Sequence, residues 1–228
     1  MPRVGELIIG LAVGAAILTV VVAALFVRNR EGPAPGLTQS ERIEQSFETD
    51  GSPRIVIESW RGPVTVRGTT DGAVRVEILR TGTGATEQEA FDNLTRLESR
   101  VVQDGDTITV RTFRSDAAAA PAGTRAVIVV LAPPGAAVEI AATGDEGVTV
   151  VDITGELDVT AEAGIDVEVA PGAAFELDAA SGAGTIDDAI GLGAVPVVNG
   201  RGQALIARRG EGGNSIVLRA GADITISR

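Results

Sequence analysis

Five acidic side chains in the second half of the chain have the residue type and spacing that could support chemistry. Each stands between apolar residues, so strand alternation directs it outward; they are Asp158, Asp166, Glu168, Glu176 and Asp178. Paired carboxylates can hydrolyse glycosidic bonds, but this needs a cleft and an acid of raised pKa. The alternation alone indicates neither, so carbohydrate hydrolysis is the less favoured interpretation.

Carboxylates are also natural calcium ligands, which makes Asp158, Asp166 and Glu168 candidate metal residues. The glycines between the predicted strands, however, do not follow the G-G-x-G-x-D-x-U-x spacing of calcium-binding β-rolls. We therefore interpret the acidic side chains as a solvated outer face. We expect neither a metal nor a cofactor.

The composition excludes most other catalytic groups. The chain has no His and no Cys, and all 19 of its basic residues are Arg. This removes Cys nucleophiles, His general bases, Schiff-base lysines, disulfides and the usual zinc ligands. Gly82-Thr83-Gly84 precedes a predicted helix, but a dinucleotide fingerprint needs a third Gly where Glu87 stands, so we interpret it as a plain strand-to-helix loop. We predict that the protein is not an enzyme.

Charge and the single Trp limit the possible partners. From residue 31 onward, 16 Arg stand against 30 acidic residues, a net charge of −14 that repels nucleic acid. Trp60 precedes Arg61-Gly62-Pro63 in a predicted turn. An exposed Trp there is a candidate surface contact for a protein or a cell-envelope glycan, although a lone Trp beside a strand more often belongs to the core.

The chain opens with an apolar segment long enough to cross a membrane. After a short tail at 1–6, residues 7–27 carry no charge and extend roughly 31 Å as a helix, against about 30 Å of bilayer hydrocarbon. A cleaved signal peptide is the alternative, but its apolar region usually spans about 7 to 15 residues. We predict a retained single-pass helix that contacts membrane lipid through Leu7, Ile8, Ile9, Leu18, Val22, Leu25 and Phe26.

The flanks of this segment leave its orientation open. Arg3 precedes it and Arg28, Arg30 and Arg42 follow it, so the positive-inside rule leans slightly against an outward-facing carboxyl end. Residues 28–42 contain the Pro- and Gly-rich run RNREGPAPG and are predicted to form a spacer. The folded domain is predicted to occupy 43–228.

Most of this domain alternates apolar and polar residues with period two, which is typical of half-buried strands. Strands are predicted at 54–58, 64–67, 74–79, 99–102, 107–111, 127–131, 138–140, 148–150, 157–159, 165–169, 175–177, 195–198, 204–207, 215–218 and 224–226. Asp104-Gly105 and Asn199-Gly200 are hairpin turn signals. One helix interrupts the strands: Thr86 and Glu89 form a capping box, and Ala90, Phe91, Leu94 and Leu97 are predicted to share its apolar face.

Short strands with turns too short for helical crossovers fit a β-helix or a sandwich, and their loose spacing favours an irregular solenoid. In that solenoid Val150, Val159, Val167 and Leu177 should point inward and stack from one rung to the next. The fold class predicted is therefore all-β, an irregular right-handed β-helix with one short helix, preceded by a transmembrane helix.

A family resemblance supports this prediction. Residues 126–189, from AVIVVLAPPG to GTIDDA, and 214–227, NSIVLRAGADITIS, resemble the bacterial putative-adhesin family of domains of unknown function, with its "p-G" turn, "G-x-v-x-v" units and closing "i-x-l-x-x-x-x-G-x-i-x-i". The likeness spans roughly 47–228. It implies a right-handed single-stranded β-helix held outside the cytoplasmic membrane by one amino-terminal helix, without catalytic residues. Ala222-Asp223 departs from the pattern, because Gly is common there.

Three function classes follow. A membrane-anchored binding or adhesion module on the cell surface is favoured, because a repetitive face offers contact area without visible chemistry. An envelope regulator that transmits stress or partner occupancy through its anchor is the alternative. A carbohydrate-active enzyme is the third and least favoured class.

Overall fold

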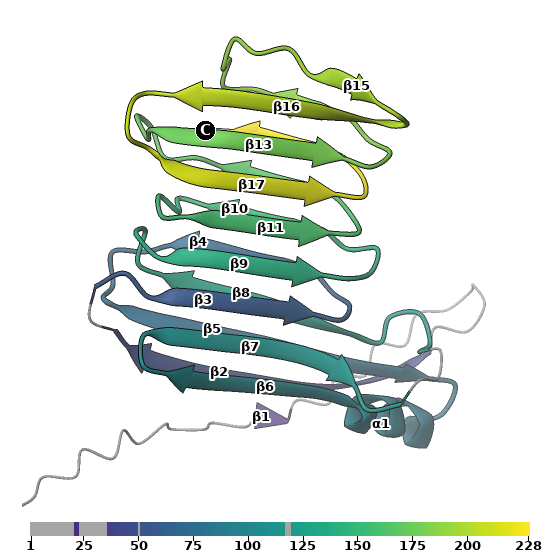
Figure 1. The fold of residues 1–228 in the computed structure, drawn as a ribbon. Helices are drawn as coiled ribbons and strands as arrows, with labels where there is room; N and C mark the ends of the chain where they lie inside the picture. The colour runs from purple at the N-terminus through teal and green to yellow at the C-terminus, as the bar shows by residue number, and fades with distance from the viewer. Residues whose placement is uncertain (1–20, 23–35, 50, 117–119) are drawn as a thin grey trace, which may run out of the picture.

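The computed structural model describes residues 21–22, 36–49, 51–116 and 120–228. These residues form two nine-stranded sheets and one helix (Figure 1). In spatial order, sheet A contains β1 (Val21–Val22), β2 (Leu37–Glu48), β5 (Ala73–Gly84), β8 (Arg125–Ala132), β4 (Val64–Gly68), β10 (Val148–Val151), β12 (Ile165–Glu168), β18 (Ile224–Ser227) and β14 (Ile186–Asp188). Sheet B contains β15 (Val197–Asn199), β16 (Gly202–Arg209), β13 (Phe175–Ser181), β17 (Asn214–Ala220), β11 (Leu157–Ala161), β9 (Ala137–Ala142), β3 (Arg54–Ser59), β7 (Thr107–Arg114) and β6 (Leu97–Asp104). The all-β prediction is confirmed.

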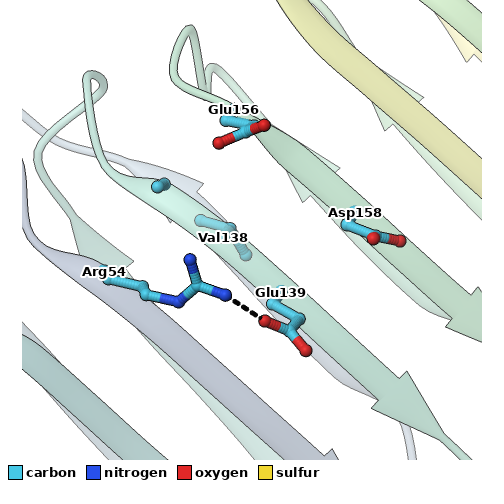
Figure 2. A pocket seen from close by; sticks show the side chains of 6 residues that line it. Arg54, Val138, Glu139, Glu156 and Asp158 are labelled. Carbon is cyan, nitrogen blue, oxygen red and sulfur yellow. Dashed lines mark hydrogen bonds and ion pairs between the residues drawn. The ribbon is translucent and has the colours of Figure 1, made fainter.

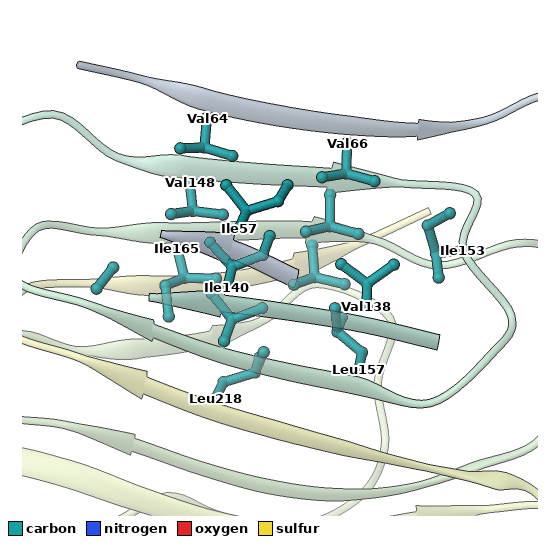
Figure 3. Close-up of a cluster of buried hydrophobic side chains, with 14 of the residues drawn as sticks. Ile57, Val64, Val66, Val138, Ile140, Val148, Ile153, Leu157, Ile165 and Leu218 are labelled. Carbon is teal, nitrogen blue, oxygen red and sulfur yellow. The ribbon is translucent and has the colours of Figure 1, made fainter. Parts of the chain in front are cut away.

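The inner faces of the two sheets meet in one continuous core of aliphatic side chains. Val64, Val148 and Ile165 of sheet A pack in the same cluster as Ile140 and Leu157 of sheet B (Figure 3). Val150, Val159, Val167 and Leu177 are all buried, as predicted. β-branched and Leu side chains dominate this core, which fills a thin layer between the sheets and includes one fully enclosed ring, that of Phe175.

The order of strands in the sheets differs from their order in the chain. From β8 to β14 the chain alternates between sheet A and sheet B, but β17 lies between β11 and β13, and β18 lies between β12 and β14. Leu177 is therefore opposite Ile216 of β17, and β17 separates it from β11. The prediction that Val159 and Leu177 belong to successive stacked rungs was wrong, since the carboxyl-terminal strands insert between them.

Both ends of the stack are built from antiparallel strands, whereas the middle is parallel. β2, β5 and β8 pair antiparallel at one end of sheet A, and β13, β16 and β15 pair antiparallel at one end of sheet B. The sheets are thus mixed and open. A regular right-handed winding stays a prediction.

Both predicted hairpins are present, with their loops one residue further on. Asp104 pairs with Thr107, so the two-residue loop is Gly105-Asp106, and Gly105 takes the positive φ of 57° at the first loop position. Asn199 pairs with Gly202 in the same way, which leaves Gly200, with φ 65°, at the start of its loop. In each case Gly accepts a backbone conformation that other residues adopt at a cost.

Helix α1 (Glu87–Arg96) begins at the predicted capping box. The Thr86 hydroxyl accepts a hydrogen bond from the Glu89 N–H at 3.2 Å, and the Glu89 carboxylate accepts one from the Ala85 N–H at 2.8 Å. Ala90 and Leu94 are buried as predicted. Phe91, however, is 55% exposed, so its predicted place on the apolar face was wrong.

Asn93 takes the inward position instead, because its amide donates to the Thr83 carbonyl at 2.8 Å and so satisfies a buried polar group. Gly82 and Gly84 lie within β5, not in the predicted loop. A Cβ on Gly82 would lie 2.3 Å from the Leu94 nitrogen, so these glycines allow α1 to pack directly on the strand.

The amino-terminal predictions fall largely outside the described residues. Of the predicted 7–27 helix, only Val21–Val22 are described, and they form β1, paired antiparallel with β2 at Arg42 and Glu41. The other predicted anchor residues lie outside, namely Leu7, Ile8, Ile9, Leu18, Leu25 and Phe26. No helix in the described part of the chain has the length and apolar character to cross a membrane. β2 begins at Leu37, within the predicted 28–42 spacer, so the folded part starts earlier than Ile43.

Candidate functional site

The predicted acidic side chains are exposed, as expected, but they lie on two different outer faces. Asp158 is on β11 of sheet B, whereas Asp166 and Glu168 are on β12 of sheet A. With the core between the sheets, these three candidates cannot coordinate one ion. Among the residues that the structure describes, no group of three or more acidic side chains is placed to hold a metal.

The other two predicted carboxylates, Glu176 and Asp178, form ion pairs with Arg residues. These pairs were not predicted from the sequence. Asp178 pairs with Arg219 at 2.7 Å, and Glu176 pairs with Arg208 at 3.2 Å. The side chains of both pairs are at least two-fifths exposed, and such surface pairs contribute little stability. They indicate a solvated, partly neutralised face.

Asp158 borders a small hollow on the outer face of sheet B (Figure 2). Arg54, Glu139 and Glu156 line it as well, and the Arg54 guanidinium pairs with the Glu139 carboxylate. Its volume is about 110 Å³, well below the roughly 300 to 1,000 Å³ of small-molecule sites. It holds one Arg and three carboxylates, and nothing in it encloses a substrate.

Among the residues that the structure describes, Asp116 and Asp223 have a perturbed pKa, and both have structural partners. A side-chain hydrogen bond from Arg114 holds the pKa of Asp116 below its usual value. Hydrogen bonds from the backbone N–H and hydroxyl of Thr185, at 2.7 and 3.0 Å, lower the pKa of Asp223. Lowered values keep both groups ionised, which is the opposite of what a general acid needs.

Trp60 is half-buried and packs against the core at the corner between β3 and β4. Its backbone N–H donates to the Thr112 hydroxyl at 3.2 Å, its carbonyl accepts from the Thr143 hydroxyl at 2.6 Å, and the Arg61 guanidinium lies 5.0 Å from its ring centre. These contacts fix the conformation of the backbone between β3 and β4. A surface contact through Trp60 stays a prediction.

A larger groove lies on the outer face of sheet A, where β2, β5 and β8 are neighbours. Its volume is about 510 Å³, within the range of binding sites. Val129 and Leu131 of β8 form an aliphatic floor. The rim carries the charged side chains Arg42, Glu44, Arg75 and Glu77.

The rim charges of this groove balance one another. Arg42 pairs with Glu44 at 2.6 Å and with Glu77 at 2.8 Å, and Arg75 pairs with Asp71 at 2.8 Å. Two Arg and two Glu therefore line the groove. In a chain of net charge −12, the four charged side chains of the rim have no net charge, so they repel another acidic surface less than the rest of the domain does.

The sequence of β8 contains a signal for the groove, which the prediction of strands from alternation did not use. β8 reads RAVIVVLA, with apolar residues at positions facing both sides of the sheet. Ile128 and Val130 face the core and are fully buried, while Val129 and Leu131 are half-buried on the outside. A strand apolar on both faces is typical of one covered on both faces, yet no element of the described structure covers this side.

Comparisons with known proteins find similarity only to solved structures, at low sequence identity. No protein-family model and no curated protein matches the chain. A crystal structure described as a putative cell adhesion protein from Clostridium sporogenes is 16% identical, with a TM-score of 0.48 over 82% of this chain and 99% of that one.

Two further crystal structures, both of proteins described as putative adhesins, are similar at lower levels. The Bacteroides fragilis protein is 10% identical, with a TM-score of 0.27 over 81% of this chain and 96% of that one. The Parabacteroides distasonis protein is 9% identical, with a TM-score of 0.31 over 82% of this chain and 65% of that one. All three TM-scores lie below 0.5, so these likenesses do not indicate a function for this chain.

Proposed function

We propose that this chain is a non-catalytic binding module, held at the cytoplasmic membrane by its amino-terminal apolar segment, with the β-sheet domain outside the cell and engaged in adhesion. The observation that carries the proposal is the groove on sheet A, where an aliphatic floor on β8 faces outward beneath a neutral charged rim. The uncharged segment 7–27 supports the anchor. The alternation of β8 to β12 between the sheets supports a solenoid winding.

The chemistry of the groove favours a protein segment over a glycan. Its lining contains no aromatic ring, whereas an amphipathic ring is the side chain most suited to a sugar face. An extended segment with apolar side chains on one side can cover Val129 and Leu131. Charged groups that flank this segment can then form ion pairs with the rim side chains Arg42, Glu44, Arg75 and Glu77, in place of the ion pairs that these make within the domain.

The experiment is a pull-down of the tagged full-length chain from cross-linked, detergent-solubilised membranes of the cells that express it. We compare wild type with Leu131→Gln, which removes one of the two apolar side chains of the floor, and with Thr225→Gln, a matched change on β18. Thr225 lies opposite Asp166, on the same outer face of sheet A. It is not part of the groove. Burying one Leu contributes about 1.5 to 3 kcal/mol, so Leu131→Gln should reduce recovery of the partner about tenfold or more.

Three results would contradict the proposal. Equal recovery by Leu131→Gln and wild type, at equal melting temperature, would remove the groove as the binding surface. Absence of any protein enriched over an unrelated anchored domain would remove the binding function. Full protection of the domain from protease in intact spheroplasts would place it on the other side of the membrane.

A further inference from the structure

The most exposed large apolar side chains gather at one end of the stack. Val195, Val197, Val198 and Ile206 are 82%, 68%, 76% and 79% exposed, whereas the next most exposed large apolar side chain of the described residues, Phe91, is 55% exposed. They belong to β15, the residues just before it, and the adjacent strand β16. Figure 1 shows β15 and β16 at the end of the stack opposite α1 and β2. We call this end, residues 189–200 with Ile206, the tip.

The tip is uncharged in a strongly acidic protein. Residues 189–200 read AIGLGAVPVVNG and contain no Asp, Glu or Arg. Inside this segment Ile190 and Leu192 pack against the core, and the Asp188 carboxylate fixes it by accepting from their backbone N–H groups. The exposed valines are therefore carried by an anchored segment, and an approaching acidic molecule meets no repulsion there.

β15 also presents an open strand edge. It is the last strand of sheet B, and it pairs on one side with β16 through Val197 opposite Ala204 and Asn199 opposite Gly202. Asn199 and Gly202 close a two-residue hairpin, so the alternation of an antiparallel ladder directs the N–H and C=O of Val198 away from β16.

Sheet edges in monomeric proteins are normally protected by charged side chains. The opposite edge of sheet B follows this rule, because β6 carries Glu98, Arg100 and Asp104. The β15 edge has no charge at all. One edge of the same sheet is thus protected from pairing and the other is not.

We propose that the tip is a homotypic contact, in which β15 of one copy pairs antiparallel with β15 of a second copy across a two-fold axis at Val198. Val198 then faces Val198 of the other copy, and Val197 faces Asn199. This short strand is self-complementary in that register, and the contact closes after two copies. A second copy is the partner that fits because two identical acidic domains repel over their charged surfaces and can meet where charge is absent.

The position of the tip adds a consequence that rests on the proposed function. β2, which follows the apolar amino-terminal segment, lies at the opposite end of the stack from β15 (Figure 1). A domain anchored at its β2 end presents its tip away from the membrane. Tip-to-tip pairing then joins molecules on two facing membranes.

The test measures association of the full-length chain in density-matched detergent by sedimentation equilibrium. Wild type should dimerise. Val198→Asp and Val198→Arg should each weaken the dimer at least tenfold, since like charges then face each other across the axis, and an equimolar mixture of the two should restore it. Because Val198 is exposed, both variants should have the same melting temperature as wild type. Val102→Asp, on the opposite edge strand β6, should leave the dimer unchanged.

A wild type that stays monomeric at all concentrations would overturn the proposal. This outcome would also be expected if a different protein occupied the tip. Dimerisation of Val198→Asp at wild-type strength would overturn it too, and failure of the mixture to pair would overturn the two-fold register. Leu131→Gln keeps the dimer in this assay, so loss of the groove function and loss of tip pairing are separate results. Vesicles that display the full-length chain should aggregate, whereas vesicles displaying Val198→Asp should not.

Discussion

The middle of the stack and its two ends are stabilised in different ways. In the middle, parallel strands share one register, so that Val150 of β10 lies beside Val167 of β12, which lies beside Ile226 of β18. At the ends there is no next strand to continue such a row. One end is closed by antiparallel strands and α1, and the other by the antiparallel strands β16 and β15 with the uncharged segment before β15. Rows of core side chains therefore need only the alternation of apolar and polar residues, whereas each end needs its own covering element.

A charge buried in the middle of the stack should have the largest effect on stability. Val167 is buried between Val150 and Ile226, while its neighbour Asp166 is exposed on the same strand. An unpaired charge in the core costs several kcal/mol, a large part of the roughly 5 to 15 kcal/mol that stabilises a domain. Val167→Asp should therefore unfold the domain or lower its melting temperature sharply in thermal denaturation.

Asp166→Val is the matched control and should fold normally. A slip of one residue in register would exchange the two faces of β12. Equal melting temperatures for the two variants would therefore contradict the described core.

The helix end should respond less strongly, and in a residue-specific way. Leu94 is buried against β5, so Leu94→Ala should lower the free energy of unfolding by about 2 to 3 kcal/mol in urea titrations. Phe91 is exposed on the same helix, so Phe91→Ala should change it by less than about 0.5 kcal/mol. A larger loss for Phe91→Ala than for Leu94→Ala would mean that α1 packs with the opposite face.

Most strands of the domain could be predicted from the sequence, because alternation of Val, Ile and Leu with polar residues is strong along them. β2 and β14 could not be predicted in this way. On the inner face of β2, Gln45 lies between Ile43 and Phe47, which interrupts the apolar pattern. β14 has only three residues, too few to show a pattern. The order of the strands was also beyond a local pattern. Nothing near Ile216 indicates that β17 inserts between β11 and β13, because that pairing is long-range.

The binding surfaces were less predictable than the fold. The sequence directed attention to Asp158 and Asp166, which alternation places outward, but it could not show that they lie on opposite sides of the core. The groove and the tip are both apolar, and in a sequence an apolar residue in a strand is taken as buried. Val129 and Val198 are exceptions: β8 is apolar on both faces already in the sequence, but only the folded structure shows that its outer face is uncovered and that β15 is the last strand of sheet B.

A smaller effect is expected where the middle meets the tip. Ala222-Asp223 departs from the putative-adhesin pattern that the sequence resembles, and Asp223 holds this turn through hydrogen bonds. Its carboxylate accepts two hydrogen bonds from Thr185, just before β14, and its carbonyl accepts one from the Ile165 N–H at 2.9 Å. One residue thus connects the starts of β12, β18 and β14.

Asp223→Asn should lower the melting temperature at pH 7, and the deficit should depend on pH. The folded-state pKa of Asp223 is below its ordinary value of 3.8, so its stabilisation is complete above that value and is lost as the pH falls through the lowered folded-state pKa. The difference in melting temperature from wild type should therefore shrink in acid. Asp187→Asn, an exposed change on β14, serves as control, and a deficit that grows as the pH falls would contradict the Thr185 contact.

The smallest effect concerns salt, and it tests the whole acidic surface. Thirty acidic residues against 16 Arg from residue 31 onward repel one another, and added salt screens this repulsion with a Debye length of about 10 Å at 0.1 M. Calcium and magnesium at matched ionic strength should therefore raise the melting temperature by similar, modest amounts. A dedicated calcium site would instead add about 2.7 kcal/mol at 100 times its dissociation constant. Saturable stabilisation by micromolar calcium, absent with magnesium and abolished by Asp158→Asn or Asp166→Asn, would show that one outer face holds an ion after all.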